Sequence, residues 1–167
     1  MSLHEIFERH GTDKAGHGYA KIYEPLLEPR RETIRLVLEV GIGTMIHNAP
    51  STMRGYVPDD YQPGASLRAW REYFPNAVIW GVDTQRDTQF REHRIVTCLA
   101  DTTDENQVNA ALSGVVFDLI IDDGCHLLQS QRATAKHLWK HLNHGGLYVI
   151  EDVTDFPTRH VLTVMAK

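Results

Sequence analysis

The feature of this sequence that most constrains its fold is a set of five short apolar runs, each of which ends in polar or acidic residues. The runs are IRLVLEVGIG from Ile34, AVIWGVD from Ala77, RIVTCLAD from Arg94, VVFDLIIDD from Val115 and GLYVIED from Gly146. Uninterrupted apolar runs of this length are typical of strands that are buried on both faces. Segments with helical spacing separate the runs, and parallel neighbours need such crossover helices. The sequence therefore predicts an α/β fold with a Rossmann-like, doubly wound, mostly parallel sheet.

The length of 167 residues corresponds to a single domain, residues 1–167. Within this domain we expect an N-terminal helical cap over residues 1–34 and a core sheet over residues 35–153. The segment 44–65 contains Pro50, Pro58 and Pro63 and shows little periodicity. We interpret it as a lid loop, because a long loop inside a compact domain is usually functional or mobile.

Capping patterns predict several helix boundaries. Ser2 and Glu5 have the spacing of a capping box, which predicts a helix at the N-terminus. Ser66 is predicted to cap the helix formed by LRAWREYF. The last helix before the fifth run is expected to place Gln131 on its solvent side and to end at the segment 143–146, NHGG.

Composition and charge argue against two classes of partner. The chain has 17 basic and 22 acidic residues, a net charge of -5, and no basic cluster longer than Arg30-Arg31, so we expect no binding to nucleic acid. No apolar run approaches the ~20 residues that a membrane span needs. The N-terminus lacks an apolar core of signal-peptide length, and Cys98 and Cys125 are the only cysteines. We therefore expect a cytoplasmic protein without a membrane partner.

The polar strand ends form a candidate cofactor site, because ligands of doubly wound sheets bind beyond the carboxyl ends of the strands. Gly41 and Gly43 allow the backbone to approach a ligand. An isoleucine replaces the third glycine of the dinucleotide fingerprint, which favours a nucleoside without phosphates. Asp83 is expected to accept hydrogen bonds from ribose hydroxyls, and Asp101 to meet an adenine amino group. Together with Glu39, these residues form the pattern of an S-adenosylmethionine site.

A second candidate site consists of four carboxylates that follow the fourth and fifth runs, namely Asp122, Asp123, Glu151 and Asp152. The two strands are expected to be neighbours, about 4.8 Å apart. Carboxylates that close repel one another unless a cation or protons intervene, and Mg²⁺ with oxygen ligands is the simplest remedy. Zinc held by Cys125 and His126 is an alternative, although no second cysteine or histidine pair has the usual spacing. His126 also lies where it can act as a general base.

The motifs of these sites resemble those of a known family. They are GTDK, LEVGIG, GASLRAW, YFPNAVIWGVD, FDLIIDDGCH and GGLYVIEDV, and they extend from Gly11 to Val153. In combination they resemble the metal-dependent sugar O-methyltransferases of macrolide biosynthesis, of the mycinamicin and demethylmacrocin type. The pairing of IIDDGCH with YVIED is the specific part, whereas the glycine motif is shared with other folds. The resemblance implies a class I methyltransferase fold.

The resemblance also implies roles for individual residues. Asp123, Glu151 and Asp152 match the family's magnesium ligands, and His126 matches its proposed catalytic base. The general cofactor positions are matched by Glu39, Gly41, Gly43, Asp83 and Asp101. Thr12, Asp13 and Lys14 belong to a signature expected near the methionyl end of the cofactor, and Ser66 and Asp122 complete the predicted cofactor set. Cys125 stands where serine is common in relatives, and no catalytic role is expected for it.

The sequence departs from this family's pattern after the fifth run. Class I methyltransferases normally continue with another helix and strands six and seven, whereas TDFPTRHVLTVMAK follows Val153 here. Its part HVLTVMA has the length of one short strand or helix. We therefore expect a sheet that lacks the usual strands six and seven, either as a shortened domain completed by a partner subunit or as a fragment.

These observations predict Mg²⁺-dependent transfer of a methyl group from S-adenosylmethionine to a hydroxyl of a sugar or glycosylated natural product. The main alternative is a non-catalytic S-adenosylmethionine-binding or assembly module. A nicotinamide oxidoreductase and a metal hydrolase are less favoured, because the dinucleotide fingerprint is incomplete and the cofactor positions suit a nucleoside. The predicted partners are a small-molecule sugar or glycoside acceptor and further copies of the chain in a homo-oligomer.

Overall fold

The structure is a computed structural model, which describes residues 1–49, 51–153 and 162–167. The strands are β1 (Leu36–Val40), β2 (Val78–Asp83), β3 (Arg91–Glu92), β4 (Ile95–Leu99), β5 (Phe117–Asp122), β6 (Leu142–Ile150) and β7 (Thr163–Ala166). The α-helices are α1 (Leu3–His10), α2 (Ala20–Leu27), α3 (Ala65–Tyr73), α4 (Glu105–Leu112) and α5 (Leu128–Leu138). Short 3₁₀ turns are η1 (Asp13–Ala15), η2 (Glu28–Arg30), η3 (Arg86–Thr88) and η4 (Trp139–His141). No described helix is long and apolar enough to cross a membrane.

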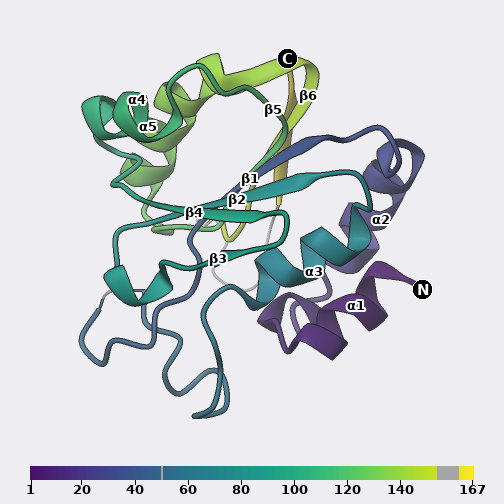
Figure 1. The fold of residues 1–167 in the computed structure, drawn as a ribbon, viewed down its shortest axis with the longest axis vertical. Coiled ribbons are helices and arrows are strands. Elements are labelled where there is room, and N and C mark those ends of the chain that lie inside the picture. Colours follow the sequence, from purple (N-terminus) through teal and green to yellow (C-terminus); the bar gives the residue numbers. More distant parts are fainter. Residues whose placement is uncertain (50, 154–161) are drawn as a thin grey trace.

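The strands form one sheet in the order β3-β4-β2-β1-β5-β6-β7 (Figure 1). The neighbours from β4 to β6 are parallel, whereas β3 and β7 are antiparallel at the two edges. The predicted doubly wound, mostly parallel sheet is therefore confirmed. The register pairs Val40 with Asp122 and Asp122 with Ile150. The residues that follow β1, β5 and β6 consequently meet at one edge of the sheet.

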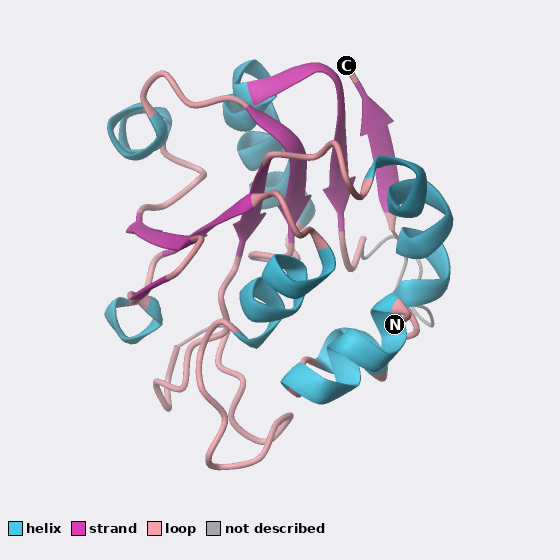
Figure 2. Ribbon diagram, turned by 45° about the vertical axis from the view of Figure 1, so that its right-hand side comes forward, coloured by secondary structure: helices cyan, strands magenta, loops and turns pink. Residues whose placement is uncertain are grey.

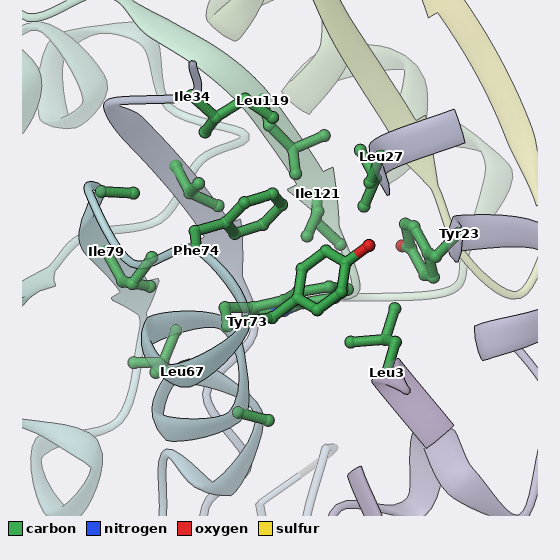
Figure 3. Close-up of a cluster of buried hydrophobic side chains, with 14 of the residues drawn as sticks. Leu3, Tyr23, Leu27, Ile34, Leu67, Tyr73, Phe74, Ile79, Leu119 and Ile121 are labelled. Carbon is green, nitrogen blue, oxygen red and sulfur yellow. The ribbon is translucent and has the colours of Figure 1, made fainter. Parts of the chain in front are cut away.

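Helices cover both faces of the sheet and create two hydrophobic cores. Helices α1, α2 and α3 pack on one face, where Val37 and Leu119 point, and α4 and α5 pack on the other, where Leu38 and Ile120 point. Successive residues of a strand point to opposite faces, which explains why these strands are apolar throughout. Figure 3 shows Phe74 of the first core beside the strand residues that it covers. Full burial of each such side chain contributes about 1.5–3 kcal/mol to folding.

Three local predictions need correction. Ser66 does not cap α3, because the N-cap is Gly64, with φ 89°, and Ser66 lies inside the helix. Gln131 is buried rather than solvent-exposed, and its side chain donates to the carbonyl oxygen of Glu151. The segment 143–146 does not end α5 but lies in β6. Strand pairing prevails there over the local turn signal, because Gly145 N–H donates to the carbonyl of Lys167 at 2.7 Å.

The structure also corrects the end of one predicted strand and shows a further strand after β6. The strand within RIVTCLAD ends at Leu99 and not at Asp101. Of the segment HVLTVMA, residues 160 and 161 lie outside the described residues, and Thr163–Ala166 form β7 beside β6. Among the described residues β7 is the only strand after β6. The strand alternative for HVLTVMA is therefore correct for residues 163–166, whereas the short strand β3 was not predicted.

The segment 44–65 lies beyond the carboxyl ends of the parallel strands (Figure 2). It is tied to the segment after β2, because the Thr44 hydroxyl and the Met45 N–H donate to the two carboxylate oxygens of Asp87 at 2.6 and 2.9 Å. Met53 N–H also donates to the Thr44 carbonyl. These contacts hold the loop beside the strand ends, and its role as a lid stays a prediction.

Candidate active site

A pocket opens where β1, β5 and β6 end. Its empty volume is about 550 Å³ when the open solvent at its mouth is included. Its wall combines η1, the strand ends and the segment 44–65. Of the predicted site residues, it brings together Thr12, Lys14, Gly41, Gly43, Ser66, Asp123, His126, Glu151 and Asp152. Glu39, Asp83, Asp101 and Asp122 lie outside its lining.

Lys14 is the positively charged residue that lies among the carboxylates at the carboxyl ends of the strands. The Thr12 hydroxyl caps η1 by accepting from the Lys14 N–H. The Lys14 side chain is only 1% exposed, and its Nζ lies 2.5 Å from Asp123 Oδ2 and 2.6 Å from Glu151 Oε2. It also lies 3.3 Å from Glu39 Oε1. Burial disfavours the charged amine, but the three carboxylates outweigh burial and raise the pKa of Lys14 well above its ordinary value.

One ammonium does not neutralise three acids. Glu39 is fully buried and accepts a hydrogen bond from Ser66 at Oε2, whereas its Oε1 makes an ion pair with Lys14 at 3.3 Å but no hydrogen bond. Burial raises the pKa of Glu39, and burial together with the Asp123 charge raises the pKa of Glu151. Burial also opposes ionisation of Asp123, but the Lys14 ammonium holds the pKa of Asp123 below its ordinary value. The excess negative charge favours either protons or a second cation.

Asp123, His126 and Asp152 form a candidate metal group. Ligand atoms from these three side chains all lie within 4.8 Å of one another. His126 Nε2 lies 3.4 Å from Asp123 Oδ1 and 3.7 Å from Asp152 Oδ2, and its side chain is 43% exposed. The hydrogen bond to Asp123 raises the pKa of His126. Two carboxylates and one imidazole suit a divalent ion, so the donor set fits a metal.

Asp152 has an unusual backbone conformation, with φ 49°. Few residues other than glycine adopt this left-handed region, although aspartate is enriched among those that do. Such conformations cluster at functional sites, where the surrounding structure imposes them. The turn directs the Asp152 carboxylate back toward Asp123 and His126.

Glu151, the third predicted magnesium ligand, accepts hydrogen bonds from protein donors at both of its carboxylate oxygens. Its Oε2 accepts from Lys14, and its Oε1 accepts from the Tyr23 hydroxyl at 2.5 Å. The described metal group therefore contains His126 in place of Glu151, and a ligand role for Glu151 stays a prediction. Tyr23, like Tyr19, was missed by sequence reasoning. The signal was present, because the two tyrosines are one helical turn apart in HGYAKIY.

The backbone conformation of both glycines after β1 favours glycine, and Gly41 is in addition required by a backbone contact within the protein. Sequence reasoning assigned them to the approach of a ligand. Both have φ 87°, which favours glycine. A Cβ atom on Gly41 would lie 2.1 Å from the carbonyl oxygen of Asp123, and one on Gly43 would lie 2.9 Å from the Tyr61 hydroxyl. Gly41 thus permits the close approach of the β1 and β5 ends.

Gly41→Ala is expected to lower the free energy of unfolding by about 2–5 kcal/mol, because left-handed backbone strain adds to overpacking against Asp123. Gly114→Ala is a matched control, since Gly114 has φ 74° and open space around its Cα. The control should lose only the backbone part, about 1–2 kcal/mol. Urea unfolding at pH 7 measures both values. Equal losses of unfolding free energy in the two variants would show that the close approach to Asp123 does not contribute to the effect of Gly41→Ala.

The remaining predicted cofactor residues already hold local structure. Asp83 is buried, and its oxygens accept from the N–H groups of Ile42 at 2.8 Å and Gln85 at 2.9 Å. Asp101 accepts from the backbone and hydroxyl of Thr103. Asp122 accepts from Gly124 N–H, and burial raises the pKa of Asp122 to about 7. Their roles toward ribose, adenine and the cofactor side stay predictions.

Comparison with known proteins reveals relatives for most of the chain. No protein-family model matches the sequence. The chain is 35% identical over 147 residues to 8-demethyl-8-alpha-L-rhamnosyl tetracenomycin-C 2'-O-methyltransferase of Streptomyces olivaceus, and 36% identical over 156 residues to demethylmacrocin O-methyltransferase of Streptomyces fradiae. These matches cover 87% and 90% of this chain and 36% of each relative. The chain thus spans about a third of the length of these relatives.

A solved structure shares the fold. MycE, a methyltransferase from the mycinamycin biosynthetic pathway, was solved in complex with Mg and SAH and superposes with a TM-score of 0.77 at 31% identity. The match covers 90% of this chain and 39% of that one. A second MycE structure, which also contains mycinamycin VI, gives the same TM-score at 32% identity and covers 91% of this chain and 39% of that one. The predicted class I methyltransferase fold is confirmed.

Proposed function

We propose that the chain, which is similar over most of its length to O-methyltransferases of rhamnosyl tetracenomycin and demethylmacrocin, transfers a methyl group from S-adenosylmethionine to a hydroxyl of a sugar or glycosylated natural product, with Mg²⁺ as cofactor. The observation that carries this proposal is the group formed by Asp123, His126 and Asp152 at the strand ends. MycE, which has the same fold, was solved with Mg and with SAH, the demethylated cofactor.

In this proposal Asp123 and Asp152 hold the metal, with Glu151 as the further predicted ligand. Bound Mg²⁺ supplies Lewis-acid chemistry, which lowers the pKa of a hydroxyl and orients it. His126 accepts the hydroxyl proton through its imidazole ring, and the 43% exposure of this side chain makes the ring accessible to an acceptor. The pocket wall around Gly41, Thr12 and the segment 44–65 orients cofactor and acceptor, and effective molarity contributes about 7 kcal/mol or more.

Removal of metal tests this function. In the presence of S-adenosylmethionine and a panel of glycosides with free hydroxyls, EDTA is expected to reduce product formation to background, and excess Mg²⁺ to restore it. Mass spectrometry of the acceptors, with a gain of one methyl group, is the measurement. Transfer that is insensitive to EDTA would exclude the metal from the reaction while leaving methyl transfer in place.

The second candidate is a non-catalytic S-adenosylmethionine-binding or assembly module. It is favoured by Lys14, whose ammonium already lies against Asp123 and Glu151, two of the predicted metal ligands. Calorimetry with S-adenosylmethionine separates the two candidates. Cofactor binding without transfer to any acceptor of the panel would support the module.

A further inference from the structure

The segment 12–23 supplies a hydrogen-bond donor to three of the four acids at the ends of β5 and β6, namely Asp123, Glu151 and Asp152. Lys14 donates to Asp123 and Glu151. The Tyr19 hydroxyl donates to Asp152 Oδ1, and the Tyr23 hydroxyl donates to Glu151 Oε1, both at 2.5 Å. These contacts join residues more than 100 positions apart in the sequence, so the N-terminal cap is physically part of the site.

The second oxygen of each aspartate faces His126. Asp123 binds Lys14 through Oδ2, and its Oδ1 is the atom near His126. Asp152 binds Tyr19 through Oδ1, and its Oδ2 is the atom near His126. An aspartate that is held by one oxygen cannot rotate freely, which fixes the direction of the other oxygen. Glu151 differs, because both of its oxygens are held.

The two tyrosines are themselves fixed by packing. Tyr19 and Tyr23 are 1% and 0% exposed. The Tyr23 ring meets the Trp70 ring edge-on at 5.1 Å and the Tyr19 ring at 6.4 Å. Tyr19 also meets the ring of His17 at 5.6 Å. Because the rings are buried in a core of aromatic side chains, their hydroxyls present donors in a defined direction before any ligand binds.

We propose that Tyr19 and Tyr23 are positioning residues. Tyr19 holds Asp152 so that its Oδ2 is pre-organised for a divalent cation, and Tyr23, together with Lys14, fixes Glu151 beside that position. The proposal rests on the proposed function for its metal. It assigns to the N-terminal cap a role in metal affinity. The competing interpretation is structural, in which the hydroxyls only satisfy buried carboxylates and contribute to stability alone.

Phenylalanine substitutions distinguish the two interpretations, since they remove the donors and keep the rings. In the double variant Tyr19→Phe/Tyr23→Phe, Mg²⁺ affinity is expected to fall about 10–100-fold, the usual effect of losing outer partners of metal ligands. Tyr73→Phe is the matched control, because the Tyr73 hydroxyl belongs to the same aromatic core but donates to Glu28 at 2.8 Å, away from the site. Calorimetric titration of each protein with MgCl₂, without acceptor, gives the affinities.

Thermal unfolding in EDTA accompanies each titration, so that a loss of fold is not read as a loss of metal binding. If the double variant does not fold, Tyr19→Phe alone is used, and its Mg²⁺ affinity should fall about 10-fold. A folded Tyr19→Phe protein with the affinity of the wild type would overturn the positioning role and leave the proposed function intact. Absence of Mg²⁺ binding by the wild-type protein would overturn both the positioning role and the metal of the proposed function.

Discussion

Asp123→Asn is expected to lower Mg²⁺ affinity more than about 100-fold, since losing only an outer partner of a ligand costs about 10–100-fold. The substitution removes the charge that faces both Lys14 and His126 while keeping the size of the side chain. Methyl transfer at a fixed, subsaturating Mg²⁺ concentration should fall by a similar factor. Calorimetry with MgCl₂ and an initial-rate assay measure the two effects.

Asp104→Asn is the control for this experiment. It makes the same chemical change at the N-cap of α4, and asparagine caps helices as well as aspartate does. The control should retain the wild-type Mg²⁺ affinity and rate. A folded Asp123→Asn protein that binds Mg²⁺ like the wild type would remove Asp123 from the proposed ligands.

His126→Ala is expected to reduce turnover about 10²–10⁴-fold, the usual contribution of a positioned general base. Because the two aspartates remain, binding of S-adenosylmethionine should be unchanged when it is measured by calorimetry in the presence of saturating Mg²⁺. Saturating metal also compensates for any ligand role of the imidazole, which belongs to the same group of donor atoms. A loss of turnover under these conditions therefore reports on proton transfer.

His144→Ala provides the comparison, because His144 is exposed near the start of β6, at the end of the strand opposite the site. It should leave turnover unchanged. Undiminished turnover of His126→Ala would exclude His126 as the base, and a loss in both variants would point to an effect on the sheet instead of on the chemistry.

Much of this architecture was predictable, because its signals are local. Apolar runs predicted the buried parallel strands, and the sheet topology then implied that Asp123 and Glu151 would meet. Local signals gave wrong predictions where hydrogen bonds to residues distant in the sequence determine the local structure. The NHGG segment resembles a helix end, but pairing with the C-terminal residue keeps it in β6. Ser66 resembles a cap, but its hydroxyl donates to Glu39.

The same limit applies to the site. Sequence reasoning placed the acids correctly at the carboxyl edge of the sheet. It considered only a metal ion or protons as the means of reducing the repulsion between their charges. It did not connect Lys14 with Glu39 and Glu151, because that contact depends on how the N-terminal cap packs across the sheet. The spacing of the two tyrosines was visible in the sequence, but it did not identify them as site residues, since a pair of aromatics at helical spacing is also typical of an ordinary core.

The buried ammonium of Lys14 has a consequence for the order in which the protein matures. In many small metalloproteins the ion provides the folding energy, and the chain is unfolded until metal arrives. Here a resident cation from the chain itself lies among the strand-end carboxylates. Folding of this edge therefore does not depend on uptake of a metal ion, and the protein is expected to have the same fold in EDTA as in Mg²⁺.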